Sequence, residues 1–247
     1  MKEFEDHFSR RAGTYVRYRP TYPEELYSYL ASISPHRQVA WDCGTGNGQA
    51  ALGLAGHFDR VVATDASQEQ IALAHPHDRI TYRVARSEAS GLEARSVALV
   101  TVAVAVHWFD LDQFYSEVRR VLTPHGVIAV WCYSLPAINP EIDAILKRYF
   151  REILSDDWPE RFRYVRDQYR TLPFPFESLP APKLTMETVW DLNDVFGFLQ
   201  SWSGTVAYEK RNGHNPIELI RSDLTDEWGD AGERLLLWKL FMRVGRV

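Results

Sequence analysis

The strongest constraint on the fold of this chain is the stretch from Val39 to Gln49, which reads VAWDCGTGNGQ. A short apolar run meets an aspartate and then three glycines at alternate positions, Gly44, Gly46 and Gly48. Glycine permits the left-handed backbone of a sharp turn and leaves that backbone bare for a ligand. Because a helical pattern follows, the stretch predicts a strand, a turn and a helix that bind a nucleotide-like cofactor.

The segments after the glycine turn alternate between strand and helix patterns, which favours an α/β fold. The run 97–106 is almost wholly apolar, as expected for a central parallel strand covered on both faces. We therefore expect a doubly wound, mostly parallel seven-stranded sheet with ligands outside the carboxyl ends of its strands. The other predicted strands are 39–43, 60–64, 80–84, 127–133, 184–192 and an antiparallel last strand at 235–247, and the predicted helices are 50–58, 67–74, 110–122, 141–154, 192–202 and 216–228.

We expect these elements to form a single domain of 247 residues with a small helical lid. The lid or insertion is placed at 136–182, because its second half is rich in arginine and ends in TLPFPFESLPAP, whose four prolines exclude regular structure. The other predicted parts are an N-terminal cap segment at 1–35, a cofactor-binding core at 36–135 and closing strands and helices at 183–247.

Composition excludes several classes of protein. The formal net charge is -5 and no long block of like charge is present, so we expect no nucleic-acid partner. No apolar run has the length of a signal peptide or a membrane span, so we expect a cytoplasmic protein with no membrane partner. We also expect a monomer or weak homodimer. The two cysteines, Cys43 and Cys132, supply neither a disulfide framework nor a zinc set, and we expect no metal.

The acid before the glycines narrows the choice of cofactor. Gly46, Gly48 and Ala51 match the spacing of dinucleotide-binding loops. Asp65 lies where a ribose-binding acid is expected, so an NAD-dependent oxidoreductase is an alternative. Asp42, however, would repel a bound pyrophosphate and suits a cofactor that carries an ammonium group and no phosphates. S-adenosylmethionine has that chemistry.

Motifs along the first half of the chain resemble one family. They are D-C-G-T-G-N-G-Q at the turn, D-A-S-x-x-Q from Asp65, the pair Ser87 and Glu88, and H-W-F-D followed by E-V-R-R-V-L-T-P-H-G. This set, from about Phe8 to Tyr133, resembles the class I S-adenosylmethionine-dependent methyltransferases of type 11. F-S-R-R-A-x-x-Y-x-x-Y-R-P-T-Y-P and A-V-H-W-F-D are most similar to the branch that contains trans-aconitate methyltransferases. The resemblance implies a Rossmann-like fold and methyl transfer to a small molecule.

The resemblance also implies which residues hold the cofactor. The glycine turn would surround the methionine portion, with Asp42 near its amino group. Asp65 would accept both ribose hydroxyls, the alternative being that it caps the following helix. Glu88 would accept a hydrogen bond from the adenine amino group, the alternative being that it is only a solvated surface acid. The cofactor-binding residues are thus predicted to be Asp42, Gly44, Thr45, Gly46, Asn47, Gly48, Asp65, Ala66, Gln70, Ser87, Glu88, Val104 and Ala105.

His107 and Trp108 follow the fourth strand and would face the transferred methyl group. Methyl transfer from a sulfonium is an in-line displacement that needs no enzyme nucleophile. A carboxylate acceptor would need no base either, whereas a hydroxyl or amine acceptor would make His107 the candidate base. The alternative is that His107 only orients the turn and Trp108 packs in the core.

Arginines alternate with tyrosines near the N-terminus, and guanidinium groups bind carboxylates in bidentate fashion. We therefore predict an anionic small-molecule acceptor clamped by Arg19 or Arg17, with Tyr18, Arg19 and Tyr22 as substrate residues. The alternatives are a solvated basic face and, for the whole protein, a non-catalytic S-adenosylmethionine-binding function. The basic groups are Arg10, Arg11, Arg17 and Arg19, interleaved with Tyr15, Tyr18 and Tyr22, and Arg161, Arg163, Arg166 and Arg170 in the predicted lid.

Overall fold

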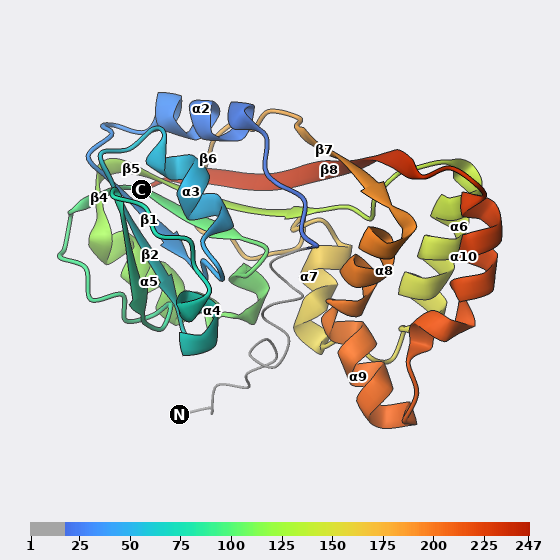
Figure 1. Ribbon diagram of the computed structural model, residues 1–247. Helices are drawn as coiled ribbons and strands as arrows, with labels where there is room; N and C mark the ends of the chain where they lie inside the picture. Colours follow the sequence, from blue (N-terminus) through green and yellow to red (C-terminus); the bar gives the residue numbers. More distant parts are fainter. Residues whose placement is uncertain (1–17) are drawn as a thin grey trace. The chain divides into compact units, whose positions relative to one another are not determined.

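The computed structural model describes residues 18–247 and divides them into two compact units (Figure 1). Unit 1 contains residues 18–21, 134–162 and 185–239, and unit 2 contains residues 22–133, 163–184 and 240–247. The predicted lid, 136–182, is therefore divided between the two units. Strand β8 (Glu233–Arg246) has residues in both.

Unit 2 is built on the predicted parallel sheet. Strands β3, β2, β1, β4 and β5 lie in this order and are all parallel. Residues 240–246 of β8 pair antiparallel with β5, and the two-residue strand β6 (Glu177–Ser178) closes the path beyond β8. The mostly parallel, seven-stranded path, in which the last strand of the chain is antiparallel, confirms the predicted fold class. The strand predicted at 184–192 was expected in this sheet, but it pairs only with β8 and lies off the path, where the unpredicted β6 takes the seventh place. The parallel strands are β1 Val39–Cys43, β2 Arg60–Asp65, β3 Ile80–Val84, β4 Val97–Ala103 and β5 Leu122–Tyr133.

The centre of this sheet explains the apolar run that predicted it. The first six residues of β4 are completely or almost completely buried, because strands flank it and side chains cover both of its faces. Helix α5 packs Phe114 and Val118 against this core. The helices of unit 2 are α2 Glu24–Ile33, α3 Gln49–Ala55, α4 Gln68–Ala72, the short turn η2 Val106–Trp108, α5 Leu111–Val121 and α7 Arg163–Arg166.

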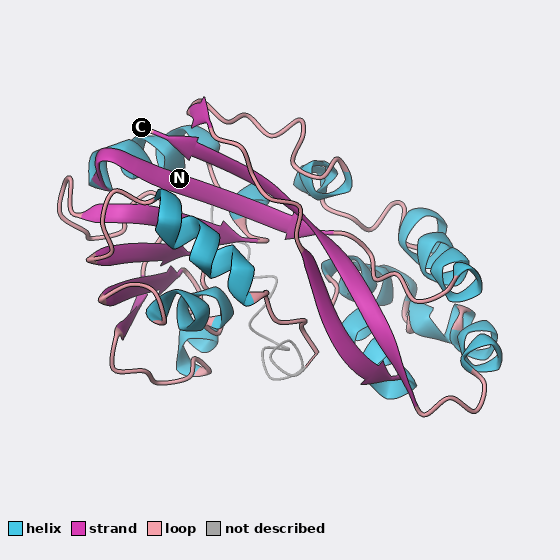
Figure 2. Cartoon of the chain, turned by 90° about the horizontal axis from the view of Figure 1, so that it is seen from above, coloured by secondary structure: helices cyan, strands magenta, loops and turns pink. Residues whose placement is uncertain are grey.

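Unit 1 combines helices with a two-stranded ribbon, in which β7 (Thr185–Asp191) pairs antiparallel with residues 233–239 of β8 (Figure 2). Its core is aromatic: Trp238 contacts both Trp190 and Phe198, and Phe198 contacts Trp202. Helix α9 was not predicted. The helical elements are α6 Pro140–Arg148, η3 Tyr149–Ile153, η4 Glu160–Phe162, α8 Leu192–Gln200, α9 Ser203–Asn212, η5 Pro216–Leu219 and α10 Arg221–Trp228.

Three expectations about individual elements were wrong. The strand predicted to reach 106 ends at Ala103, because Val104 adopts a φ of 53° that no strand can continue. The proline-rich stretch contains β6, since the residues between Pro175 and Pro180 still pair with β8. The strand predicted at 127–133 begins earlier, at Leu122, because β5 follows α5 with no loop between them.

Within residues 18–247, no helix combines the length and the apolarity that crossing a bilayer requires. The same residues contain no group of three or more histidine, cysteine, aspartate or glutamate side chains that could hold a metal ion.

Candidate active site

The glycine turn after β1 adopts the backbone that its sequence demands. Gly44, Gly46 and Gly48 have φ angles of 68°, 56° and 90°, in the left-handed region that other residues rarely occupy. The backbone N–H groups of Gly44 and Thr45 both donate to the carbonyl of Thr64, at 2.8 and 3.0 Å. The turn is therefore fixed to the carboxyl end of β2.

Neighbouring side chains crowd the turn at two of its three glycines. A Cβ atom on Gly44 would lie 2.7 Å from the Cβ of Ala105, and one on Gly48 would lie 2.3 Å from the hydroxyl of Tyr82. Both distances are shorter than non-bonded heavy atoms tolerate. The predicted cofactor residues Ala105 and Gly44 are thus in direct contact across the ends of β1 and β4.

Asp42 is a fully buried carboxylate directly beneath the turn. It accepts hydrogen bonds from the hydroxyls of Thr45, at 2.6 Å, and Thr101, at 2.7 Å. Burial raises the pKa of Asp42 to about 6, against the effect of these two hydrogen bonds. The surrounding protein thus opposes the ionised form, and a nearby cation would favour it.

Asp65 ties the turn to the next helix. One carboxylate oxygen accepts from the N–H of Gly46 and the other from the N–H of Ser67, both at 2.9 Å. Ser67 itself caps α4, because its hydroxyl accepts from the N–H of Gln70. Each oxygen of Asp65 has a second lone pair with which a ribose hydroxyl could bond. Asn47 and Ala66 are half-buried beside these groups.

Two buried oxygens beside the turn have no hydrogen-bond partner in the described part of the chain. They are Oε1 of Gln70 and the hydroxyl of Tyr82. Oε1 of Gln70 lies 3.7 Å from where a Cβ on Gly46 would stand. Buried polar atoms are normally satisfied, so these two suit a polar ligand lying on the turn.

The pair Ser87 and Glu88 follows β3, as predicted. The carboxylate of Glu88 accepts from the hydroxyl of Ser87, at 3.1 Å, and from the guanidinium of Arg86. Partial burial opposes ionisation, yet the hydrogen bonds from its own backbone and from Arg86 outweigh burial and hold the pKa of Glu88 below its usual range. Arg86 therefore helps to keep a charged acceptor there.

The segment after β4 is strained. Val104 has a left-handed φ of 53°, which is unusual for a β-branched residue, and its N–H donates to the carbonyl of Trp131 at 2.8 Å. This conformation ends the strand and turns the chain toward Gly44. The backbone of Val104 and Ala105 therefore lies at the same sheet edge as the glycine turn.

His107 is buried, with 2% of its surface exposed, and its Nδ1 lies 3.0 Å from the hydroxyl of Tyr169. Burial lowers the pKa of His107 to about 3, so its ring is neutral at physiological pH. Trp108 is half-buried and its ring lies 4.9 Å from that of His107. Sequence reasoning missed Tyr169, which lies in the stretch interpreted as a lid and shows no motif.

The predicted substrate residues lie in two units. In unit 1, the guanidinium of Arg19 lies 5.3 Å from the centre of the Phe198 ring, and Tyr18 packs on Gly197. In unit 2, Tyr22 makes an edge contact with Trp131 at 5.4 Å. The other N-terminal candidates, Arg10, Arg11, Tyr15 and Arg17, lie outside the described residues.

Comparison with known proteins decides the family. A model of the methyltransferase domain matches residues 41–130. A protein of Dictyostelium discoideum named as a methyltransferase is 34% identical over 226 residues, which is 90% of this chain and 86% of that protein. The chain belongs to the methyltransferase family.

A solved methyltransferase structure supports the assignment over almost the whole chain. The protein from Anaeromyxobacter dehalogenans, described as a type II methyltransferase, is 43% identical, has a TM-score of 0.85 and covers 92% of this chain and 97% of that one. Phosphoethanolamine N-methyltransferase 2 of Haemonchus contortus, solved with S-adenosylhomocysteine, shares the fold at 18% identity and a TM-score of 0.50, covering 96% of this chain and 57% of that one. None of these matches supports the oxidoreductase alternative.

The enzyme is thus a class I S-adenosylmethionine-dependent methyltransferase. When bound, its cofactor supplies an electrophilic methyl group. The site fits this cofactor: Asp42 offers a buried carboxylate to an ammonium group, and Oε1 of Gln70 offers an unpaired acceptor beside the turn. Cys43, the last residue of β1, is no candidate nucleophile, because burial raises the pKa of its thiol well above the ordinary value.

Proposed function

We propose that this methyltransferase transfers the methyl group to a small carboxylate acceptor by in-line displacement. The observation that supports this substrate class best is the position of Arg19 on the face of Phe198. A guanidinium over the face of an aromatic ring is attracted by the ring electrons, which restricts where the side chain lies. Arginine is also the residue that binds carboxylates through two parallel hydrogen bonds.

The state of His107 agrees with an acceptor that is already ionised. A group with a pKa of about 3 is a weak base at neutral pH. A carboxylate needs no deprotonation, so His107 can contribute by position alone, with Tyr169 fixing its ring. We assign His107 and Trp108 to the wall that orients the acceptor and excludes water from the methyl group.

The glycine turn and the acids around it hold the methyl donor in this proposal. Asp42 binds the amino group through charge, Asp65 accepts the ribose hydroxyls, and Gln70 lies against the adenine. The backbone of Val104 and Ala105 completes the methionine subsite. The similarity of the N-terminal motif suggests trans-aconitate as one carboxylate to test first.

The test is a screen of small carboxylates, phenols and amines with a radiolabelled methyl donor. We expect label to be transferred to a carboxylate, and Arg19→Ala to reduce that transfer at least ~10-fold with unchanged affinity for S-adenosylhomocysteine. Arg19→Lys should recover little, because an ammonium cannot form the bidentate pair.

Arg151→Ala, which removes an exposed arginine of unit 1, is the matched control and should leave turnover unchanged. Full activity of Arg19→Ala on the carboxylate would refute the clamp. Transfer to phenols or amines alone would refute the acceptor class. Saturable cofactor binding without methylation of any acceptor would favour the non-catalytic alternative.

A further inference from the structure

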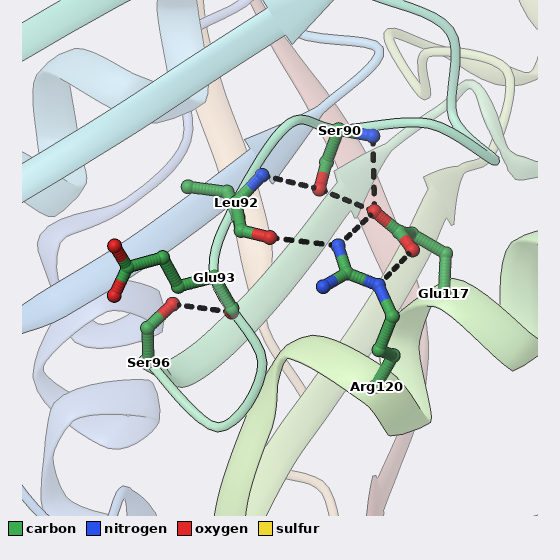
Figure 3. Close-up of polar contacts among 6 residues, drawn as sticks. All are labelled: Ser90, Leu92, Glu93, Ser96, Glu117 and Arg120. Carbon is green, nitrogen blue, oxygen red and sulfur yellow. Dashed lines mark hydrogen bonds and ion pairs between the residues drawn. The ribbon is translucent and has the colours of Figure 1, made fainter.

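Helix α5 carries the E-V-R-R-V-L motif, which has no place in the site described above. Its Glu117 is buried, with 7% of its surface exposed. The carboxylate forms a two-pronged ion pair with Arg120, at 2.7 and 2.8 Å, on the same helix. It also accepts from both the N–H of Ser90, at 3.0 Å, and the Ser90 hydroxyl (Figure 3). A charge buried at this depth requires such a set of partners.

Arg120 extends the same network along the loop between β3 and β4. Its guanidinium donates to the carbonyl of Leu92 at 2.7 Å, while its own backbone carbonyl accepts from Arg95 at 2.9 Å. The N–H of Ser96 donates to the carbonyl of Val121, also at 2.9 Å. The loop is therefore joined to the last two turns of α5 by side-chain and backbone hydrogen bonds together.

The bonded part of the loop lies next to the predicted adenine-binding residues. Ser90 is two residues beyond Glu88, which itself lies in a turn closed by a hydrogen bond from the N–H of Ala89 to the carbonyl of Arg86, at 3.1 Å. Two hydrogen bonds to Ser90 thus leave the backbone that carries Glu88 little freedom. Helix α5 begins at Leu111, after its cap Asp110, and only Phe109 separates that cap from Trp108, so one helix connects this loop with the segment after β4.

The ionised state of Glu117 allows its carboxylate to accept all of these hydrogen bonds. Burial opposes its ionisation, but the hydrogen bonds from Arg120 and Ser90 outweigh burial and hold its pKa below the usual range. The carboxylate is therefore a permanent acceptor across the physiological pH range. A glutamine at this position would keep one acceptor oxygen, lose the ion pair and place an N–H₂ donor among donors.

We propose that Glu117 is a positioning residue for adenine recognition, which it serves by fixing Ser90 and through it the carboxylate of Glu88. The proposal rests on the assignment of Glu88 to the adenine amino group. Without the Glu117 carboxylate the loop would still close, but the Glu88 side chain would occupy several positions. The enzyme would then bind its cofactor with less preference for an amino group at this place on the base.

The test compares the dissociation constants of S-adenosylhomocysteine and S-inosylhomocysteine, measured by calorimetry. The inosine base replaces the amino donor with a carbonyl oxygen, which would face the Glu88 carboxylate. We expect the wild-type enzyme to prefer the adenine ligand at least ~10-fold, and Glu88→Gln and Glu117→Gln to reduce that ratio to within about 3-fold of unity. Glu117→Gln should leave binding of S-inosylhomocysteine nearly unchanged, which a general loss of structure would not do.

Glu93→Gln is the matched control, because Glu93 is exposed on the same loop and its carboxylate points away from the network (Figure 3). It should keep the wild-type ratio. If Glu117→Gln does not fold, Ser90→Ala removes one hydrogen bond to the same carboxylate and should lower the ratio about 3-fold.

If folded Glu117→Gln keeps the wild-type ratio of the two dissociation constants, the positioning role is overturned. If Glu117→Gln does not fold, the same result in Ser90→Ala overturns it. A wild-type ratio in Glu88→Gln would overturn the adenine assignment and this inference with it, while leaving the cofactor itself intact. Failure of the wild-type enzyme to bind S-adenosylhomocysteine would instead contradict the function on which both depend.

Discussion

At the scale of single residues, the complete burial of the Asp42 carboxylate costs stability at neutral pH. Its carboxylate is fully buried and its only described hydrogen-bond donors are neutral, so its ionised form is poorly compensated. A cation arriving with the cofactor would compensate it. The structure thus contains a charge whose partner is expected to be the ligand.

Asp42→Asn should therefore stabilise the apo enzyme and weaken cofactor binding. Because the folded pKa, about 6, lies above the unfolded value of 3.8, the stability associated with this group is present below pH 3.8 and is lost as pH rises through 6. We expect the variant to gain about 1–3 kcal/mol in free energy of unfolding at pH 8, and no gain near pH 4. Urea denaturation at both pH values measures this, and equal stability of the two proteins at pH 8 would contradict it.

His107 should contribute the opposite pH dependence. Its folded pKa, about 3, lies below the usual 6.5, so the unfolded state binds the proton more tightly. The stability due to neutral His107 is present above pH 6.5 and is lost as pH falls toward 3, by about 1.4 kcal/mol per pH unit. His107→Asn should flatten the pH dependence of unfolding between pH 6 and 4. His75→Asn, at an exposed position, should not.

At the scale of elements, the glycine turn is limited by both its backbone and its neighbours. Gly48→Ala would impose a left-handed φ of 90° on alanine and place its Cβ 2.3 Å from the Tyr82 hydroxyl. We expect a loss of about 2–4 kcal/mol in unfolding free energy and weaker binding of S-adenosylhomocysteine.

A second glycine separates these two causes. Gly213 also has a left-handed φ, 75°, but no atom lies within 4 Å of a Cβ placed there. Gly213→Ala should therefore cost only the backbone strain, about 1 kcal/mol, and leave cofactor binding unchanged. If Gly48→Ala and Gly213→Ala lose the same unfolding free energy, the contact with Tyr82 does not contribute to the loss.

The elements themselves were predicted where a pattern is local. Strand β4 was recognised because a strand covered on both faces needs an unbroken apolar run, and α5 because its apolar stripe repeats at helical spacing. The end of β4 was misplaced because Val104 is apolar like the strand before it. Its left-handed backbone, whose N–H donates to the carbonyl of Trp131 on the adjoining strand, is visible only in the structure.

At the scale of the molecule, all of the predicted cofactor residues belong to unit 2, although they are spread over 42–105. We expect S-adenosylhomocysteine to slow amide hydrogen exchange at the carboxyl ends of β1, β2 and β4 and in the loop after β3. Mass-spectrometric exchange of the apo and bound enzyme measures this effect. Protection confined to residues 185–239 would contradict the assignment of the site.

The sequence by itself determined the sheet, the cofactor class and the glycine turn on which we propose that the cofactor lies. These depend on local rules: alternating glycines, an acid beside them and apolar runs of strand length. Only the tertiary structure decided that Tyr169 holds His107, that Glu117 fixes the loop of Glu88, and that the predicted lid is divided between two units. Their partners are distant in sequence, 62 positions apart for His107 and Tyr169 and 27 for Ser90 and Glu117. No local pattern encodes a contact that exists only once the chain has folded and buried both groups together.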